Sequence, residues 1–545
     1  MDRVSRSSRS SLTQRITPEQ DQTALRAPAA TGFCLWVVST CVKILLFPAY
    51  RSTDFLVHRH WKALTRTLPL EEWYFDDRHV DTVHTLDYPP GFALWESAWA
   101  NLYQGFVDWL LPSMGMFDDG DSCLQLLADE RIQQDPDVIS STCVAYLRST
   151  VVASDLLLWI GAYAVASACG SAQSRPFWTV FLLITLHPGL LWLDHVHFQY
   201  NGMLLGWLLL SVGCLMHGNQ CNTGKGLAFH AWHLAAAVSF AVLLAMKHLY
   251  LTLSLWYFAY LLRRYCFVKD KFSWFRLTSL GLVTFTTLLA PFLPFLWTAY
   301  TSTSMTMTAQ LHQIISRLFP FSRGLVHDYW AGNLWAIYAT SQKVGAAVGI
   351  TIPTPIPLLV FLLLILGLIP GSVYAWKAAR LRCNYLLLLS LSYSTWASFL
   401  LAYHVHEKAI MTTLLPLTLW CVGCFKDQSQ YLLLFWTNAF AMLGLFPLLF
   451  QPTELLLKVS SFVAYLAFLK YLATDNCNTR QQSISRWAFW CVSLCLGTMI
   501  LQLEIIPVRL YGKFEFLPLA LTSLTTAFGL IMGFAFLTHH MLSSD

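Results

Sequence analysis

The sequence predicts an all-α polytopic membrane protein with about 14 transmembrane helices. Of its 545 residues, 56% are hydrophobic and only 12% are charged. A water-soluble domain of this size cannot bury that much apolar surface, so lipid must be the solvent for most of the chain. The apolar residues occur in runs of about 20, which is the length that a helix needs to cross a bilayer.

The candidate spans follow one another at short intervals. They are 33–50, 143–168, 177–193, 200–217, 229–246, 248–263, 277–299, 335–352, 356–376, 384–402, 409–425, 430–450, 455–473, 487–507 and 515–538. The segment 335–352 contains Gln342, Lys343 and several glycines, which favour a surface or re-entrant helix over a span. Without that segment, about 14 spans remain.

The ends of the chain and its basic loops suggest an orientation. Residues 1–30 are rich in Ser and Arg, so we expect a disordered cytosolic tail. Residues 31–545 contain no sustained internal repeat and are expected to form a single transmembrane domain. With a cytosolic N-terminus, strict alternation of the spans also places the C-terminus and the basic loops at 263–276, 377–382 and 480–486 in the cytosol.

This orientation brings the polar segments together on the lumenal side. They are the long loop 51–142, the turn 194–197, residues 247–248, the second loop 300–334 and the turn 404–408. The first loop contains Trp-rich amphipathic stretches, which are typical of helices lying in the membrane interface. Polar clusters on one face indicate one composite site, whereas a transporter more often holds its ionisable groups at mid-span.

Charge and cysteine content exclude other classes of protein. The net charge of +5 is small, and the basic residues form no continuous face for nucleic acid. Most of the 14 Cys lie in apolar runs, where a thiol behaves as a small hydrophobe. Cys123 and Cys143 flank a polar stretch and are candidates for a disulfide in an oxidising lumen, although sequence does not fix the pairing. No Cys or His set has zinc-site spacing, so we predict no metal.

Two motifs in the first lumenal loop contain acidic residues. Asp54 follows the first span and has cations around it, so its carboxylate keeps its charge and is able to accept a proton from a sugar hydroxyl. Asp87 and Tyr88 precede paired prolines, which hold the backbone in an extended turn. On pattern alone, helix capping around Asp54 and ordinary turn chemistry around Asp87 remain open alternatives.

Two further lumenal segments are rich in hydrogen-bonding and cationic groups. His195, His197 and Gln199 lie in the turn 194–202, whose spacing favours sugar or phosphate contact, or helix capping, over a metal site. Arg317 and Arg323 precede a stretch of aromatic residues. Guanidinium groups bind phosphate in bidentate fashion, although anchoring to lipid head groups explains both arginines as well.

The turn 404–408 joins two long apolar spans with almost no loop between them. Its ionisable side chains are those of His404, His406, Glu407 and Lys408. Such groups are costly to hold near hydrocarbon, so a functional role is favoured. Alternate residues of an extended turn share a face, so His404 and His406 are expected to point together toward a phosphate.

Together these segments resemble the dolichyl-phosphate-glucose-dependent glucosyltransferases of the lipid-linked oligosaccharide pathway, a branch of the GT-C glycosyltransferases. The matching pieces are T-D-F-x-V-H-R-H-W at 53–61, E-W-Y at 72–74, L-D-Y-P-P at 86–90, D-H-V-H-F-Q-Y-N-G at 194–202, M-K-H-L-Y at 246–250, R-L-F-P-F-x-R-G at 317–324 and H-V-H-E-K at 404–408. The forms at 194–202 and 323–331 are more similar to the branch that adds the second glucose. Leu56 departs from the Glu usual in both branches, so no role passes to that side chain.

The resemblance implies a GT-C fold in the endoplasmic reticulum membrane with a lumenal active site. Asp54 would be the general base of an inverting transfer from dolichyl-phosphate-glucose to the glucose 3-hydroxyl of a dolichyl-diphosphate-linked oligosaccharide, giving an α-1,3 product. The leaving phosphate needs cationic or hydrogen-bonding cover, for which the candidates are Arg317, Arg323, His404, His406 and Lys408. Asp87 and Glu407 are expected to position the acceptor or hold these cations. No cofactor is expected, because no diphosphate leaves. The alternatives are the branch that adds the first glucose and, from another class, a lipid or sugar transporter.

Overall fold

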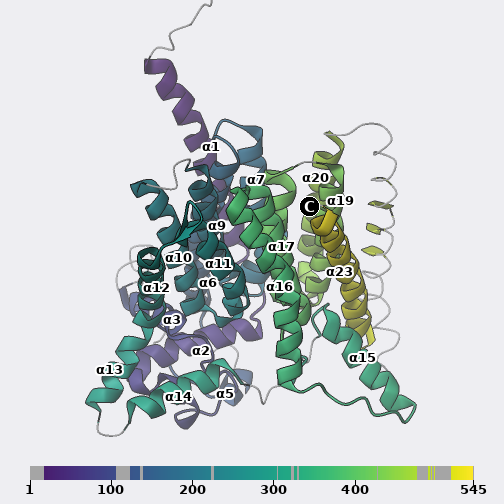
Figure 1. The fold of residues 1–545 in the computed structure, drawn as a ribbon. Coiled ribbons are helices and arrows are strands. Elements are labelled where there is room, and N and C mark those ends of the chain that lie inside the picture. The colour runs from purple at the N-terminus through teal and green to yellow at the C-terminus, as the bar shows by residue number, and fades with distance from the viewer. Residues whose placement is uncertain are drawn as a thin grey trace, which may run out of the picture.

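The computed structural model describes residues 18–105, 123–134, 139–221, 226–302, 305–320, 324–327, 330–425, 427–475 and 517–543, with a few isolated positions between 486 and 497. Within these ranges the chain is helical apart from one two-stranded hairpin (Figure 1). The prediction of an all-α polytopic membrane protein is confirmed.

In the described part of the chain, 9 helices are long and apolar enough to cross a bilayer. They are α6 (Ser141–Cys169), α7 to η4 (Arg175–Val196), α9 (Asn201–Gln220), α10 (Leu227–Met246), α12 to α13 (Trp274–Thr301), α16 (Pro357–Leu381), α19 to η10 (Gln428–Leu448), η11 to α20 (Pro452–Leu472) and α23 (Leu517–Ser543). Each of them falls on an expected span. The expected span 487–507 lies outside the described residues.

Of the other expected spans, two form single helices and two are divided into shorter pieces. The first helix, α1 (Pro18–Leu45), begins inside the segment 1–30, while α17 (Asn384–Leu401) matches its expected range closely. The expected span 248–263 is divided into η5 (His248–Leu253), α11 (Ser254–Leu261) and η6 (Leu262–Cys266). The expected span 409–425 is divided into η8 (Glu407–Ile410), α18 (Met411–Thr418) and η9 (Leu419–Gly423). Irregular backbone at such depth is tolerated where protein surrounds it.

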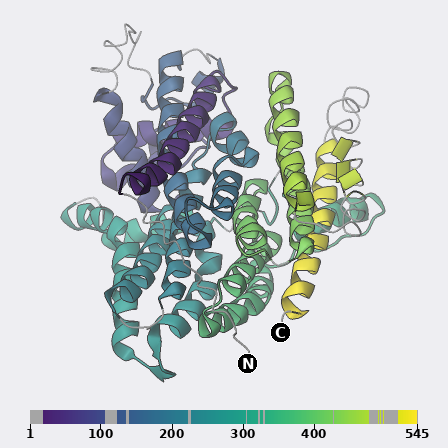
Figure 2. The ribbon, with the colours of Figure 1, turned by 90° about the horizontal axis from the view of Figure 1, so that it is seen from above.

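The helices of the long loop 51–142 gather at one end of the bundle, at the bottom of Figure 1. These are α2 (Thr53–Thr67), η1 (Leu70–Arg78), α3 (Pro90–Gly105) and α5 (Asp129–Gln134). Helix α14 (Met307–Leu318) lies at the same end, and α15 (Leu334–Ala347) extends to one side there (Figure 1). Seen from above, the purple and teal helices form one side of the molecule and the green and yellow helices the other (Figure 2).

A disulfide joins Cys123 to Cys143, with Cα atoms 5.4 Å apart. It connects the end of the first loop to the first turn of α6. Arg59 of α2 reinforces this junction, because its Nη1 donates to the carbonyls of Cys123 and Gln125, each at 3.0 Å. The pairing that the sequence left open is therefore present, and it fixes the loop to the bundle.

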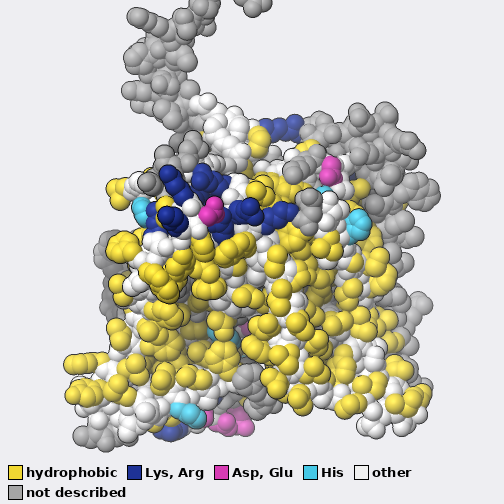
Figure 3. Space-filling view, in the orientation of Figure 1, with side chains coloured by type: hydrophobic (Ala, Val, Ile, Leu, Met, Phe, Trp, Pro, Cys, Tyr) yellow, Lys and Arg dark blue, Asp and Glu magenta, His cyan; other side chains and the backbone are white. Residues whose placement is uncertain are grey.

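The opposite end of the molecule is basic. Strands β1 (Phe267–Val268) and β2 (Lys271–Phe272) form an antiparallel hairpin there, and Lys269 and Asp270 turn it with φ of 48° and 60°. Positive φ at both turn residues matches the twist of a two-residue hairpin. Figure 3 shows Lys and Arg side chains gathered at this upper end, above a broad hydrophobic band.

Close packing between α6 and α9 forms the centre of the bundle. A Cβ added at Gly206 would lie 2.4 Å from the carbonyl of Leu157, and one at Gly161 would lie 2.4 Å from the carbonyl of Gly206. Only glycine allows the two backbones to approach so closely, as in small-residue interfaces of membrane helices. This contact fixes α9, and with it the turn 194–202 at its N-terminus.

Candidate functional site

Ser52 begins the helix that carries Asp54. Its Oγ accepts from the backbone N–H of Phe55 at 3.1 Å and donates to the carbonyl of His197. Ser52 is therefore the cap of α2, and Asp54 lies in the first turn with its carboxylate free for other contacts. A negative charge is favourable at that end of a helix.

Asp54 holds its three partners on a single oxygen. Its Oδ2 accepts from Gln199 Nε2 at 2.7 Å and from His197 Nε2 at 2.9 Å, and it forms an ion pair with Lys408 Nζ. The side chain is 21% exposed. Within the described residues, Oδ1 makes no hydrogen bond and is not buried. One oxygen is thus fixed and the other is open.

The partners of Asp54 keep it ionised. Burial alone would raise its pKa, but the ammonium of Lys408 and the hydrogen bond from His197 hold that pKa well below its usual range. Burial alone would lower the pKa of Lys408, but Asp54 and Glu407 raise it above its ordinary value. The pair is therefore a carboxylate and an ammonium at neutral pH.

The turn before α9 directs two side chains toward Asp54. After α8 (Pro188–Leu190), the π-turn η4 (Leu191–Val196) and a positive φ of 77° at Phe198 change the direction of the backbone. Asn201 Nδ2 donates to Gln199 Oε1 at 2.7 Å. The amide nitrogen of Gln199 must therefore face Asp54.

Arg148 of α6 holds together the two segments that meet at the site. Its Nη1 donates to the carbonyl of His195 at 2.5 Å, and its Nη2 donates to the carbonyls of Ala49 at 3.2 Å and Tyr50 at 2.9 Å. The guanidinium is 2% exposed. One buried cation thus satisfies carbonyls after α1 and at the end of η4, which places Asp54 and His197 next to each other.

Asp87, Tyr88 and Lys247 border the same site. The Lys247 ammonium lies 4.9 Å from the centroid of the Tyr88 ring. Burial raises the pKa of the Tyr88 hydroxyl, and the charges of Asp87 and Asp54 raise it further. Because Asp54 and Asp87 both act on Tyr88, the two predicted segments converge here.

The turn 404–408 presents a group of imidazoles as well as Lys408. His404 has a φ of 52°, and its Nδ1 lies 2.7 Å from the carbonyl of Gly324. The His406 ring lies 4.3 Å from the ring of His327 and 5.6 Å from that of His404, centroid to centroid. Burial and the charge of Lys408 lower the pKa of His406, so it is a neutral imidazole at neutral pH.

Glu407 points into the protein. Its side chain is buried, and Oε2 has no hydrogen-bond partner within the described residues. Burial raises the pKa of this carboxyl, although the charge of Lys408 opposes the shift.

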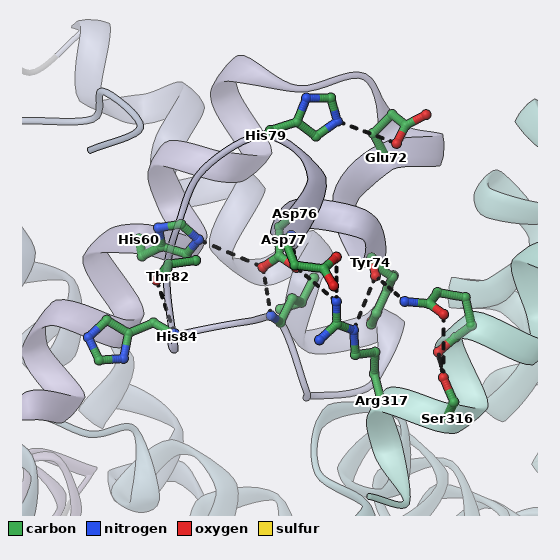
Figure 4. A network of polar contacts seen from close by, with 12 residues as sticks. His60, Glu72, Tyr74, Asp76, Asp77, His79, Thr82, His84, Ser316 and Arg317 are labelled. Atoms are coloured by element: carbon green, nitrogen blue, oxygen red, sulfur yellow. Dashed lines mark hydrogen bonds and ion pairs between the residues drawn. The ribbon is translucent and has the colours of Figure 1, made fainter. Parts of the chain in front are cut away.

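Other predicted site residues are engaged elsewhere. His195 Nε2 lies 2.8 Å from Asp155, which also pairs with Lys43 at 2.6 Å inside the bundle. Arg317 pairs with Asp77 at 2.8 Å and reaches Asp76 at 3.4 Å (Figure 4). Neither residue contacts Asp54 in the described part of the chain, so one composite site does not include them. Arg323 lies outside the described residues.

Three charged residues that the structure brings to this end of the bundle were not among the predicted site residues. Arg148 and Lys247 are two of them. The third is Glu96, which accepts from His58 Nδ1 at 2.6 Å and pairs with Lys62 behind α2. The signal was available, because a charged residue within an apolar run is costly and therefore informative.

Among the described residues, no group of three or more His, Cys, Asp or Glu side chains is placed to hold a metal ion. The chemistry of the arrangement rests on the partly exposed carboxylate of Asp54. Its open oxygen is able to accept a proton, and two lysines and an aromatic ring beside it suit an anionic, sugar-bearing ligand. Such a site at one end of a membrane helix bundle defines a membrane transferase acting on polar groups carried by lipids.

The chain belongs to the ALG6, ALG8 glycosyltransferase family, whose model matches residues 39–537. It is therefore a glycosyltransferase. Three relatives share the name dolichyl pyrophosphate Glc1Man9GlcNAc2 alpha-1,3-glucosyltransferase. The Arabidopsis thaliana protein is 32% identical over 91% of this chain and 95% of its own length. The Bos taurus protein is 32% identical over 92% and 94%, and the Coccidioides immitis protein is 34% identical over 91% and 95%.

Proposed function

We propose that this enzyme transfers glucose from dolichyl-phosphate-glucose to the glucose of Glc1Man9GlcNAc2-diphosphate-dolichol, with inversion, forming an α-1,3 linkage. The acceptor follows from the names of relatives that match more than nine-tenths of the chain. The observation that carries the mechanism is the carboxylate of Asp54, which has three partners on Oδ2 and an accessible Oδ1.

In this mechanism the acceptor 3-hydroxyl approaches Oδ1 of Asp54. Its oxygen attacks the anomeric carbon from the face opposite the phosphate, so the β-linked donor gives an α-linked product. The low pKa of Asp54 makes it a weak base, and proton transfer therefore follows bond formation. The positive charge that develops on the sugar is favoured by the nearby carboxylates, as in glycoside hydrolysis.

Several side chains around Asp54 are proposed to bind the substrates. Gln199, His197 and Lys408 fix the base, while Tyr88, Asp87, His404, His406 and Glu407 border the space for the sugars and phosphates. Roles for His195 and Arg317 are not supported by contacts with Asp54, and the proposed role of Arg323 concerns a residue outside the described ranges. We infer that the site needs no metal, and transfer in excess EDTA tests this inference.

We infer that residues 31–545 form one GT-C domain with about 14 spans in the endoplasmic reticulum membrane. The basic end of the bundle, opposite α2 and α3, supports cytosolic termini and a lumenal site. The disulfide between Cys123 and Cys143 supports an oxidising compartment around the first loop.

The decisive experiment compares acceptors. The purified enzyme in lipid vesicles receives labelled dolichyl-phosphate-glucose with a dolichyl-diphosphate glycan that carries either no glucose or one. We expect extension of the glycan with one glucose. Extension of the glucose-free glycan alone would assign the enzyme to the first transfer, and movement of the donor without a longer glycan would indicate a transporter.

A further inference from the structure

Among the described residues, the lysine and the arginine expected to cover the donor phosphate are already paired with carboxylates. Lys408 is neutralised by Asp54, and Arg317 is neutralised by Asp77 and Asp76 (Figure 4). A cation in an ion pair offers little net charge to a ligand, because its field is compensated at short range. Within the described part of the chain, the phosphate therefore needs a cation other than these two.

Lys247 lies at the site without such a partner. It ends α10 with an extended backbone (φ −151°, ψ 115°), and the chain then enters η5. Its ammonium lies 4.9 Å from the Tyr88 ring centroid. Among the described residues no carboxylate forms an ion pair with it. Of the two described lysines at this site, Lys247 is thus the one that is not held in an ion pair.

The packing of α3 on α10 places Lys247 there. A Cβ added at Gly91 would lie 2.5 Å from the carbonyl oxygen of Ala245, so the first turn of α3 touches the last turn of α10 directly. Tyr88 stands just before Gly91, and Lys247 follows Ala245 closely. The Tyr88 ring also lies 6.4 Å from the ring of His58, which is four residues after Asp54 in α2, so the aromatic partner of Lys247 packs against the helix that carries the proposed base.

On the basis of the function proposed above, we propose that Lys247 is the cation that binds the phosphate of the lipid-phosphate sugar donor. As the acceptor oxygen bonds to the anomeric carbon, the bond from that carbon to the phosphate oxygen breaks. The electron pair stays on the phosphate, and the acceptor proton goes to Asp54. Lys247 thus meets an anion whose charge grows by one unit in the transfer.

The test compares Lys247→Met with Lys247→Arg and with a matched control, Lys343→Met. Lys343 lies 4.8 Å from the Trp330 ring centroid, so it repeats the lysine-on-aromatic geometry away from Asp54. We expect Lys247→Met to raise the donor KM by about tenfold or more, with the acceptor KM unchanged. Lys247→Arg should retain most of the affinity, and Lys343→Met should match the wild type.

Binding is also measured without catalysis, as the rise in unfolding temperature that dolichyl phosphate causes. We expect the wild type to be stabilised and Lys247→Met to show no such rise. Without ligand, Lys247→Met should unfold at the wild-type temperature or above, because a partly buried cation without an ion-pair partner costs free energy.

Two results would overturn the role of Lys247. One is a wild-type donor KM and wild-type stabilisation by dolichyl phosphate in Lys247→Met. The other is a lower unfolding temperature of ligand-free Lys247→Met, which would make the lysine structural. A wild-type enzyme that binds dolichyl phosphate but does not extend the glycan would instead overturn the proposed function alone.

Discussion

Lys408 Nζ donates to Asp54 Oδ2, although the two residues are 354 positions apart in the chain. The contact joins the start of α2 to the turn between α17 and η8, so two segments that are far apart in the sequence meet at one carboxylate. Because Gln199 and His197 occupy the same oxygen, the geometry of Asp54 is set before any substrate binds. Such preorganisation is what a base on a rigid scaffold requires.

Asp54→Asn is expected to abolish glucose transfer while the protein remains folded. The amide keeps the shape of the side chain but cannot accept the acceptor proton, so the rate should fall by about 10³-fold. Turnover with the labelled donor and the unfolding temperature are measured together. The matched control is Asp270→Asn in the hairpin at the other end of the bundle, where the carboxylate is 84% exposed. Near-normal turnover of Asp54→Asn would remove Asp54 as the base.

Arg148→Met should destabilise the enzyme and also misplace its site. Removal of the guanidinium leaves the buried carbonyls of Tyr50 and His195 without a donor, at a cost of about 3 kcal/mol or more. Arg148→Lys keeps the charge but cannot span both chain segments. It should therefore cause a large fall in kcat with only a small fall in the unfolding temperature. If Arg148→Lys has wild-type kcat, the arginine only supports the fold.

Much of this architecture can be predicted from hydropathy, because a membrane span is a long run of apolar residues. The expected ranges 143–168 and 229–246 differ from α6 and α10 by only a few residues at their ends. Divided helices such as η5 with α11 are harder to predict, because their breaks arise from tertiary packing around the site. The positive φ of Phe198 has no cue in the sequence, because the glycine of this motif is Gly202, four positions later.

The residues of the site were harder to assign than the segments. His195 and His197 are two positions apart, but the π-turn ends between them. His195 therefore meets Asp155 within the bundle, while His197 meets Asp54. Sequence spacing could not separate these roles. It also could not show that Asp76 and Asp77 form ion pairs with Arg317. Arg148 was not predicted as a site residue, because the apolar run around it predicts only a membrane span.

Reduction of the Cys123–Cys143 disulfide should lower the stability of the loop 51–142. The bond closes a loop with a sequence separation of 20, and closing a loop of that size contributes about 3 kcal/mol. Cys143→Ser and reductant should therefore lower the unfolding temperature to the same extent. The control is Cys214→Ser in α9, a free thiol to which reductant makes no difference. Equal unfolding temperatures with and without reductant in the wild type would contradict a structural disulfide.

Raising the pH above about 8 is expected to weaken donor binding through Lys247. Burial and the charge of Lys408 lower the pKa of Lys247 to about 8, while Asp54, Asp194 and Asp87 oppose that shift. Lys408 stays protonated and Asp54 stays ionised through this range, because their pKa values move away from it in opposite directions. The donor is a phosphodiester, whose charge does not change there.

Through Lys247, a rise in pH weakens donor binding but favours folding. The folded-state pKa of Lys247 lies below its unfolded value, so this group opposes folding at neutral pH. The unfavourable contribution becomes smaller as the pH rises through about 8 toward the unfolded pKa. The donor KM should therefore rise above pH 8 without a loss of stability from this lysine. In Lys247→Arg the guanidinium keeps its proton, so that rise in KM should vanish. A rise of equal size in Lys247→Arg would show that another group titrates.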